Sequence, residues 1–231
     1  MNHVQRYSGR FLFAVGEYWS GDITALHRFI DLTSETVTLF DAPLHYNFHE
    51  ASLQGNDYDL RTIFDDTLVA THPELAVTLV DNHDSQPLQS LESVVEPWFK
   101  PLAYALILLR RDGYPCVFYA DYYGAHYIDT GDDGEAHEIF LNCHKWLLDK
   151  FLDARRRYGY GEQQDYFDHM NTVGWTRLGT EEHPGGMAVV MSNGEAGMKW
   201  MHIGQPNCVY VDATEHVSEP VTTDEAGWAN F

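Results

Sequence analysis

The sequence predicts an α/β protein in which parallel strands come first and a small antiparallel β region follows. Up to about residue 158, short and uniformly apolar segments alternate with segments of helical periodicity, the pattern of parallel strands covered by helices. After Gly159, short apolar segments are separated by turns rich in Gly, Asn and Pro, as antiparallel strands are. The first part fits either a doubly wound sheet or part of a (β/α)8 barrel.

Four strand–helix units make up the predicted parallel part. The strands are expected at residues 11–15, 37–40, 76–80 and 116–119, because each is a short apolar run. The helices are expected at residues 22–30, 98–111 and 139–158, because each shows apolar residues at helical spacing. A further helix with irregular ends is expected at about residues 52–68, a polar and mixed stretch. Asp22 is the expected N-cap of the first helix. The antiparallel strands are expected at residues 173–176, 187–191, 200–203 and 208–211.

The composition excludes several classes of partner and compartment. With 14 basic and 35 acidic residues the net charge is −21, which disfavours nucleic acid and anionic membranes and leaves a neutral polar substrate open. The apolar run at residues 101–109 is too short to span a bilayer, and the first ten residues lack the apolar region of a secretory signal. Three widely spaced cysteines favour a reducing cytoplasm over a disulfide framework.

Acidic and aromatic residues follow all four expected parallel strands. They are Glu17 with Tyr18 and Trp19, then Asp41, then residues 81–84, then Asp121 with two tyrosines. The carboxyl ends of parallel strands gather at one edge of a sheet, where functional residues collect. Paired carboxyl groups beside aromatic rings suit carbohydrate chemistry, since a glycosidic bond is cleaved by two carboxyl groups. The alternative is that each acid is a solvated loop residue or a helix N-cap.

Other kinds of site find less support. Neither His49 nor His137 begins an HExxH zinc motif, and residues 129–134 lack the third-position and twelfth-position ligands of a calcium loop. His137, Cys143 and His144 can share a helical face, but a surface helix explains them better than a metal site. The sequence has no Walker loop, GxGxxG or GxSxG motif, which disfavours nucleotide binding and serine hydrolysis.

Three motifs give the sequence a specific resemblance to a known family. Residues 15–19 (VGEYW), 40–45 (FDAPLH) and 80–87 (VDNHDSQP) resemble motifs of the α-amylases of glycoside hydrolase family 13. Residues 98–127 and 166–169 are similar to the bacterial liquefying α-amylases, and the GAHY segment with the following Asp129 resembles their intracellular branch. The resemblance extends over essentially the whole chain.

The resemblance implies the C-terminal half of such an enzyme. Residues 1–159 would form half of a (β/α)8 TIM barrel, with strands five to eight, and residues 160–231 a clipped C-terminal β-sandwich. The family's nucleophile lies on strand four, in a motif that this sequence does not contain. The principal calcium site lies in a domain with no counterpart here, and a second site would use Met170 and Asn171. Because Met170 is a poor ligand for a hard cation, no cofactor is expected.

The resemblance also assigns roles to individual residues. Glu17 matches the general acid/base, and Asp84 matches the third catalytic carboxylate, which helps to bind and distort the sugar. His83, Trp19 and Gln86 match positions that contact the substrate. The implied activity is hydrolysis of internal α-1,4 bonds of starch or glycogen with retention. The alternative is an inactive or weakly active chain that only binds oligosaccharide, since losing one member of a catalytic set costs orders of magnitude in rate.

A half barrel of this kind predicts that the chain assembles with further copies of itself. Four strands leave two unpaired edges and an apolar inner face, which favours a homo-oligomer, most simply a two-fold dimer that closes an eight-stranded barrel. The alternative is a monomer that covers the half barrel with its own β region. In such a dimer, Asp121 of one chain would lie near Glu17 of the other and could replace the nucleophile in trans. The alternative for Asp121 is a hydrogen bond to the following loop.

Overall fold

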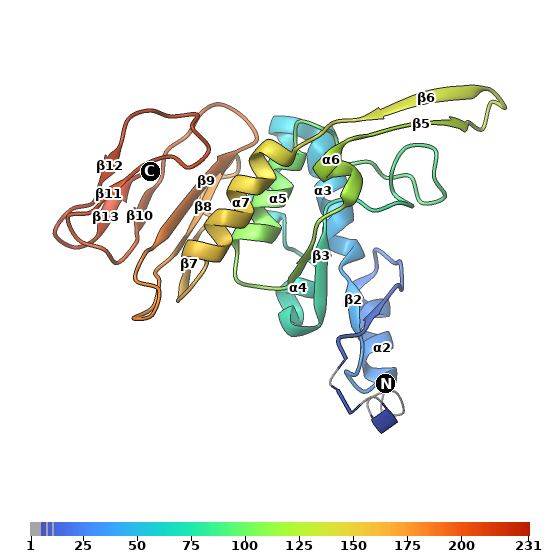
Figure 1. Cartoon of the computed structure of the whole chain (residues 1–231), viewed down its shortest axis with the longest axis horizontal. Helices are drawn as coiled ribbons and strands as arrows, with labels where there is room; N and C mark the ends of the chain where they lie inside the picture. Colours follow the sequence, from blue (N-terminus) through green and yellow to red (C-terminus); the bar gives the residue numbers. More distant parts are fainter. Residues whose placement is uncertain (1–5, 8, 11) are drawn as a thin grey trace.

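The chain forms a four-stranded parallel sheet, and smaller antiparallel sheets follow it along the sequence (Figure 1). This arrangement confirms the predicted fold class. The structure, a computed structural model, describes residues 6, 7, 9, 10 and 12–231. Four strands, β1 (Val15–Gly16), β2 (Thr38–Phe40), β3 (Ala76–Leu79) and β4 (Tyr114–Cys116), pair in parallel and in sequence order. Phe11, included in the first expected strand, lies outside the described residues.

Helices connect these strands and bury one face of the sheet. They are α2 (Ile23–Leu32), α3 (Ala42–Gln54), α4 (Leu68–Thr71), α5 (Lys100–Leu109) and α7 (Lys145–Tyr158). Asp22 caps α2 as predicted, since its side chain accepts a hydrogen bond from the Thr24 N–H. Within the described residues, no helix combines the length and the apolar character that a membrane span needs.

The helix predicted at about residues 52–68 is wrong. Instead α3 starts directly after Asp41, with Pro43 in its first turn, where a proline costs no hydrogen bond. Gly55 ends the helix at a φ of 61°, in the left-handed region that glycine adopts freely. Short 3-10 turns at η1 (Gly55–Asp57) and η2 (Leu60–Thr62) follow, and η3 (Pro73–Leu75) leads into β3.

Asp41 is a helix N-cap, which was the alternative to a role in a binding or catalytic site. Its buried carboxylate accepts hydrogen bonds from the backbone N–H groups of Leu44, Leu68 and Val69, so it caps α3 and α4 together. Burial raises its pKa to about 6, although these three donors act to lower it.

The helix predicted to begin at residue 139 begins six residues later. Its first residues belong instead to a long antiparallel hairpin of β5 (Ala125–Thr130) and β6 (Ala136–Leu141), which projects from the rest of the chain (Figure 1). β5 alternates between half-buried and exposed side chains, the period of a strand with one covered face. The segment 129–134, set aside above as a calcium loop, forms the tip of this hairpin.

The fourth parallel strand begins two residues earlier than predicted and ends three residues earlier. β4 covers Tyr114–Cys116, and Pro115 is tolerated because β4 is an edge strand of the sheet. The short helix α6 (Tyr119–Tyr123) then contains Asp121, which therefore does not extend directly from a strand end.

The antiparallel part consists of three small sheets. The largest joins β7 (Gln163–Tyr166), β8 (Thr172–Arg177) and β9 (Met187–Ser192), and two ribbons pair β10 (Trp200–His202) with β13 (Trp228–Asn230) and β11 (Val209–Tyr210) with β12 (Val221–Thr222). The four strands predicted in this region are present, and β7, β12 and β13 were not predicted.

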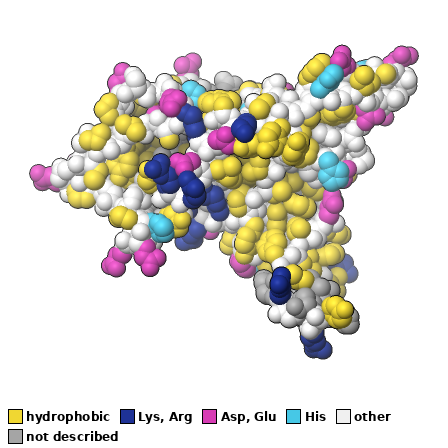
Figure 2. All heavy atoms as spheres, viewed as in Figure 1, with side chains coloured by type: hydrophobic (Ala, Val, Ile, Leu, Met, Phe, Trp, Pro, Cys, Tyr) yellow, Lys and Arg dark blue, Asp and Glu magenta, His cyan; other side chains and the backbone are white. Residues whose placement is uncertain are grey.

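The parallel sheet has one face in the core and one face that the helices leave uncovered. Leu39, Ala76 and Val80 belong to the main hydrophobic core with the helices, and this core continues into β8 and β9 through Trp175. The registered neighbours on the opposite face include Phe40, Val77 and Tyr114. Figure 2 shows hydrophobic side chains gathered over β2 and β3.

The uncovered face is concave. The ring of Phe13, just ahead of β1, lies 5.0 Å from the ring of Tyr114 in β4, although β2 and β3 separate these two strands. Two side chains can meet in this way only across the inside of a curved sheet. Phe13 is 55% exposed and Tyr114 is 46% exposed, so this inner face is open to solvent beside the edge strands β1 and β4, whereas Val77 at its centre is buried. A curved parallel sheet of this kind is an arc of a barrel wall.

Candidate active site

The segment after β1 carries the first group of predicted site residues. Glu17 directly follows β1 and is exposed, and Trp19 is half-buried. The Trp19 indole N–H donates a hydrogen bond of 3.0 Å to the hydroxyl oxygen of Tyr46 on α3. The Trp19 ring also lies 5.3 Å from the ring of His45. The chain after β1 is therefore fixed against the first turns of α3, with the Glu17 carboxyl group left accessible.

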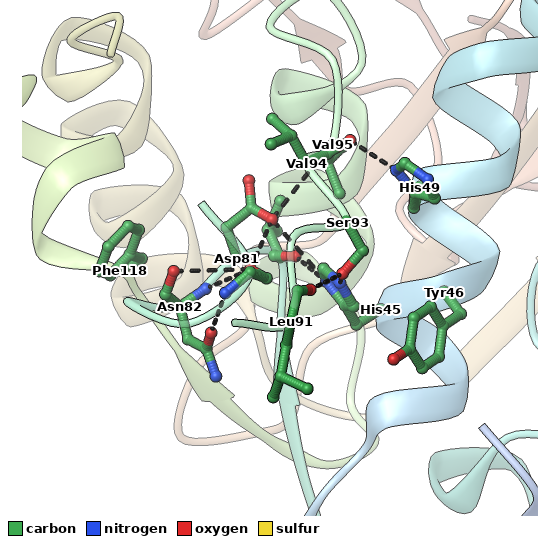
Figure 3. Close-up of polar contacts among 12 residues, drawn as sticks. His45, Tyr46, His49, Asp81, Asn82, Leu91, Ser93, Val94, Val95 and Phe118 are labelled. Atoms are coloured by element: carbon green, nitrogen blue, oxygen red, sulfur yellow. Dashed lines mark hydrogen bonds and ion pairs between the residues drawn. The ribbon is translucent and has the colours of Figure 1, made fainter. Parts of the chain in front are cut away.

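His45 connects this segment to the loop after β3. It is fully buried, and Figure 3 shows it on α3, pointing toward the loop that contains Asp81, Leu91 and Ser93. Its Nδ1 lies 2.6 Å from the Val80 carbonyl oxygen, to which it donates, and its Nε2 lies 2.8 Å from the Ser93 hydroxyl. Burial lowers the pKa of His45 to about 4, so the imidazole is neutral at pH 7.

A tight turn after β3 presents the second group of site residues. The Asn82 side-chain oxygen accepts hydrogen bonds from the backbone N–H groups of Asp84 and Ser85, and the Ser85 hydroxyl donates to Asp81 Oδ1 at 3.0 Å. This turn leaves the Asp84 side chain 31% exposed and the His83 side chain 74% exposed, with His83 Nε2 3.6 Å from Asp84 Oδ1. An aspartate and a histidine that are both accessible at a strand end can contact a polar ligand.

Gln86 follows the same turn and is half-buried. Its carbonyl oxygen accepts a hydrogen bond from the Gln89 N–H. The structure thus places four predicted residues, Glu17, Trp19, His83 and Asp84, beyond the carboxyl ends of β1 and β3, and Gln86 just after them.

A buried ionic cluster underlies these loops, and the sequence analysis missed it. Lys100 at the start of α5 is 4% exposed, and its Nζ lies 2.8 Å from Asp81 Oδ2 and also bonds Asp121 Oδ1. Tyr104 completes the cluster by donating to Asp121 Oδ2 at 2.7 Å. The signal that could have found it is a lysine within the apolar helix pattern at residues 98–111, since a buried lysine needs carboxylate partners.

The charges in this cluster compensate one another. Burial acts to lower the pKa of Lys100, but Asp121 and Asp81 outweigh it and the pKa is raised. Burial raises the pKa of Asp81 to about 6, even though Lys100 acts to lower it. Lys100 is therefore charged at neutral pH, and it joins the loops that follow β3 and β4.

The structure corrects the expectation for Asp121. The carboxylate is fully buried and held by Lys100 and Tyr104, and the residue lies in α6 rather than at a strand end. A nucleophile must reach the sugar, and this carboxylate could do so only by leaving Lys100 in a buried site without one of its partners. Asp121 is therefore an element of the cluster, and its assignment as a nucleophile in trans is withdrawn.

A cavity lies beside the predicted site residues rather than on them. Its volume is about 800 Å³, and it is lined by Tyr46, by the loop at residues 88–93, by Thr130–Asp133 at the tip of the hairpin and by His137. Gln89 Nε2 donates to Asp129 Oδ2 at 2.8 Å and so ties this loop to the hairpin. Among the described residues, no group of three or more His, Cys, Asp or Glu side chains is arranged to hold a metal ion.

The buried His45 gives a testable dependence of stability on pH. The unfolded state takes up a proton as the pH falls below about 6.5, whereas the folded state does so only near pH 4, so stability is lost as the pH falls through this window. Between pH 7 and pH 4.5, the free energy of unfolding in urea is expected to fall by about 2–3 kcal/mol more for the native chain than for His45→Gln.

Asp41 and Asp81 contribute to the pH dependence of stability with the opposite sign, because a raised carboxyl pKa favours the folded state at low pH. Both residues are present in the native chain and in His45→Gln, so their contributions cancel in the comparison. Identical pH profiles for the native chain and His45→Gln would contradict the assignment of a buried neutral imidazole.

Comparison with known proteins finds relatives of this chain among the α-amylases. The α-amylase of Geobacillus stearothermophilus is 47% identical over 234 residues, which cover all of this chain and 41% of that protein. The cytoplasmic α-amylase of Escherichia coli is 50% identical over all of this chain and 47% of its own length. The chain is therefore related over its whole length to part of the α-amylases. It spans less than half the length of these curated relatives.

Other comparisons agree on the fold. A glucan 1,4-α-maltohexaosidase from a Bacillus species is 47% identical over all of this chain and 43% of its own length. A cyclomaltodextrin glucanotransferase structure matches all of the chain and 52% of its own with a TM-score of 0.63 at 16% identity, and the α-amylase I of Eisenia fetida matches 84% and 46% with a TM-score of 0.60 at 11% identity. No family model matches the sequence.

Proposed function

We propose that this chain is an α-amylase-type glycoside hydrolase that cleaves internal α-1,4 bonds of starch or glycogen with retention. Glu17 acts as the general acid/base and Asp84 as the third catalytic carboxylate, which helps to bind and distort the sugar, while Trp19, His83 and Gln86 contact the sugar. The observation that carries the proposal is the accessible Glu17 and Asp84 at one edge of the parallel sheet, in a chain 47–50% identical to α-amylases over its whole length. The relation to a cytoplasmic α-amylase favours the cytoplasm as its location.

A second function has one observation in its favour. Asp121, the acid that could have supplied a nucleophile in trans, is buried in an ion pair. A chain with an accessible acid and sugar contacts but no available nucleophile would bind oligosaccharide without cleaving it.

Starch hydrolysis separates the two functions. Purified chain is incubated with soluble starch, and the release of reducing sugar is followed as protein concentration rises. A glycosidase releases sugar whose initial anomeric configuration is α, as retention requires. No release at any concentration, together with saturable binding of maltohexaose, would contradict hydrolysis and support the binding function.

The open inner face supports a homo-oligomer that completes the barrel. Val15, Phe13 and Tyr114 expose apolar side chains there, and β1 and β4 are the edge strands of the sheet. An isologous dimer would bury this face and pair both edges.

Light scattering at micromolar concentration is therefore expected to give about twice the 26.5 kDa mass of one chain. The substitution Val15→Asp places a charge on the inner face and is expected to yield monomers. Val211→Asp, at a position 77% exposed beyond β11, is expected to leave the assembly unchanged. A native chain that remains monomeric and folds cooperatively would contradict the dimer.

A further inference from the structure

Arginine side chains gather where the parallel part of the chain meets the antiparallel part. Six of the fourteen basic residues lie there, in three segments: Arg110 and Arg111 just after α5, residues 155–157 in the last turn of α7, and Arg177 at the end of β8. Figure 2 shows Lys and Arg side chains gathered around the C-terminal end of α7. In a chain of net charge −21, this region is a local concentration of positive charge.

Hydrogen bonds and strand register bring the three segments together. Arg155 Nη1 donates to the Arg110 carbonyl oxygen at 3.2 Å and to a carbonyl oxygen in the last turn of α5 at 2.6 Å. The Arg111 backbone N–H donates to Gln163 Oε1 on β7 at 2.8 Å, and the register of β7 and β8 places Gln163 opposite Arg177. Opposite residues of an antiparallel pair point to the same face of the sheet. The Arg177 side chain therefore lies on the face that contacts the Arg111 segment.

Carboxylates pair with part of this positive charge. Within the part of the chain that the structure describes, neither Arg155 nor Arg177 forms an ion pair with a carboxylate. Glu162 lies beside β7, but its Oε1 accepts a hydrogen bond of 3.5 Å from Gln164 Nε2, on the strand face opposite to Gln163. Three carboxylates serve the other four guanidinium groups: Asp165 pairs with Arg110, Asp112 with Arg111, and Asp153 with both Arg156 and Arg157.

The burial of Arg177 makes this imbalance important. The residue is 4% exposed, its Nη2 donates to the Gly161 carbonyl oxygen at 3.3 Å, and its buried Nε has no hydrogen-bond partner among the described residues. Burial lowers the pKa of Arg177, and the positive charges of Arg111 and Arg155 lower it further, although a guanidinium stays protonated in a protein. A buried charge without a counter-charge is strongly destabilising. This environment therefore favours the binding of an anion.

Guanidinium chemistry indicates which anion fits. The planar fork of N–H groups matches two oxygens of a phosphate group, and several arginines together can satisfy its remaining oxygens and its charge. We propose that Arg111, Arg155 and Arg177 form a binding site for a phosphate group, carried either by inorganic phosphate or by a phosphorylated sugar. We call these three residues the arginine site. A phosphate held there would join the segment after α5 and the helix α7 to the strand β8.

The arginine site is separate from the candidate active site. Arg111 precedes β4, whereas Glu17 and Asp84 lie beyond the carboxyl ends of β1 and β3, so the two sites are at opposite edges of the parallel sheet. A phosphate group at the arginine site does not compete with a sugar at the other edge. The proposal stands on the contacts and the burial of the arginines and does not depend on the proposed function.

The test measures the binding of inorganic phosphate to the purified chain by titration calorimetry at constant ionic strength, with the urea midpoint as a second readout. We expect saturable binding and a midpoint that rises with phosphate concentration, because a ligand bound by the folded state alone stabilises it. Arg177→Gln is expected to weaken the affinity about tenfold or more. Without phosphate, this variant is expected to unfold at the native urea midpoint or above it, because it removes the uncompensated charge.

Arg111→Gln is an independent variant at an accessible position. The Arg111 side chain is 61% exposed, so its replacement leaves the packing intact, and the affinity for phosphate is expected to fall by about threefold or more. Arg28→Gln, at an exposed position on α2, removes the same charge elsewhere and is the matched control that keeps the native affinity.

Glucose 6-phosphate distinguishes the two sources of the phosphate group. Tighter binding of glucose 6-phosphate than of inorganic phosphate identifies a phosphorylated sugar, equal binding identifies free phosphate, and both results support the site. Absence of saturable phosphate binding overturns the proposal, and so does native affinity in both Arg177→Gln and Arg111→Gln. Acetate that binds as tightly as phosphate overturns the assignment to a phosphate group.

Discussion

Replacing Glu17 with glutamine is expected to lower the release of reducing sugar from starch by at least about 10²-fold without changing the fold. An amide has the size of the carboxyl group but cannot deliver a proton to the leaving oxygen of a glycosidic bond. Glu17 is exposed and directly follows β1, so its replacement removes no buried contact. Far-ultraviolet circular dichroism and the urea midpoint are expected to match the native chain.

The control is the same substitution at the opposite edge of the sheet. Glu74 lies in η3, immediately ahead of β3, and is exposed. Glu74→Gln changes the net charge by the same amount and is expected to retain native activity. If Glu17→Gln and Glu74→Gln release sugar at the same rate as the native chain, the activity comes from another group or from a contaminating enzyme, and the role of Glu17 is disproved.

Local pattern was enough to predict the parallel sheet and the accessible loop residues. The runs around β2 and β3 are uniformly apolar because both faces of these strands are buried or nearly so, and this pattern is visible without tertiary context. Motif resemblance then supplied Glu17, His83 and Asp84, which the structure places beyond the carboxyl ends of β1 and β3.

The errors have physical causes that involve residues distant in sequence. The strand β6 was taken as helix because Ile139, Phe140 and Leu141 fit an apolar helix start, and only pairing with β5 decides otherwise. Asp121 looked like a free strand-end acid because its partner Lys100 lies 21 residues earlier, on another element. Burial of a charge depends on the packing of several elements, and no local pattern reports it.

Lys100 connects the loop that presents Asp84 to the segment after β4. Its Nζ lies between Asp81 and Asp121, and Asp81 in turn accepts from the Ser85 hydroxyl within the turn that follows β3. All three charged side chains of this cluster are 5% exposed or less. Two carboxylates without the lysine would repel each other in a poorly hydrated interior, where the cost of an unpaired charge is several kcal/mol.

Lys100→Met is therefore expected to lower the free energy of unfolding in urea at pH 7 by about 3–5 kcal/mol. The matched control is Lys150→Met on α7, where the lysine pairs with a glutamate whose side chain is 81% exposed, and the expected cost is below about 1 kcal/mol. Adding Asp81→Asn and Asp121→Asn to Lys100→Met removes the two stranded charges while keeping acceptors for Ser85 and Tyr104, so this triple variant is expected to recover most of the loss. A cost for Lys100→Met no larger than that for Lys150→Met would show that water reaches the cluster and that Lys100 does not hold the two loops together.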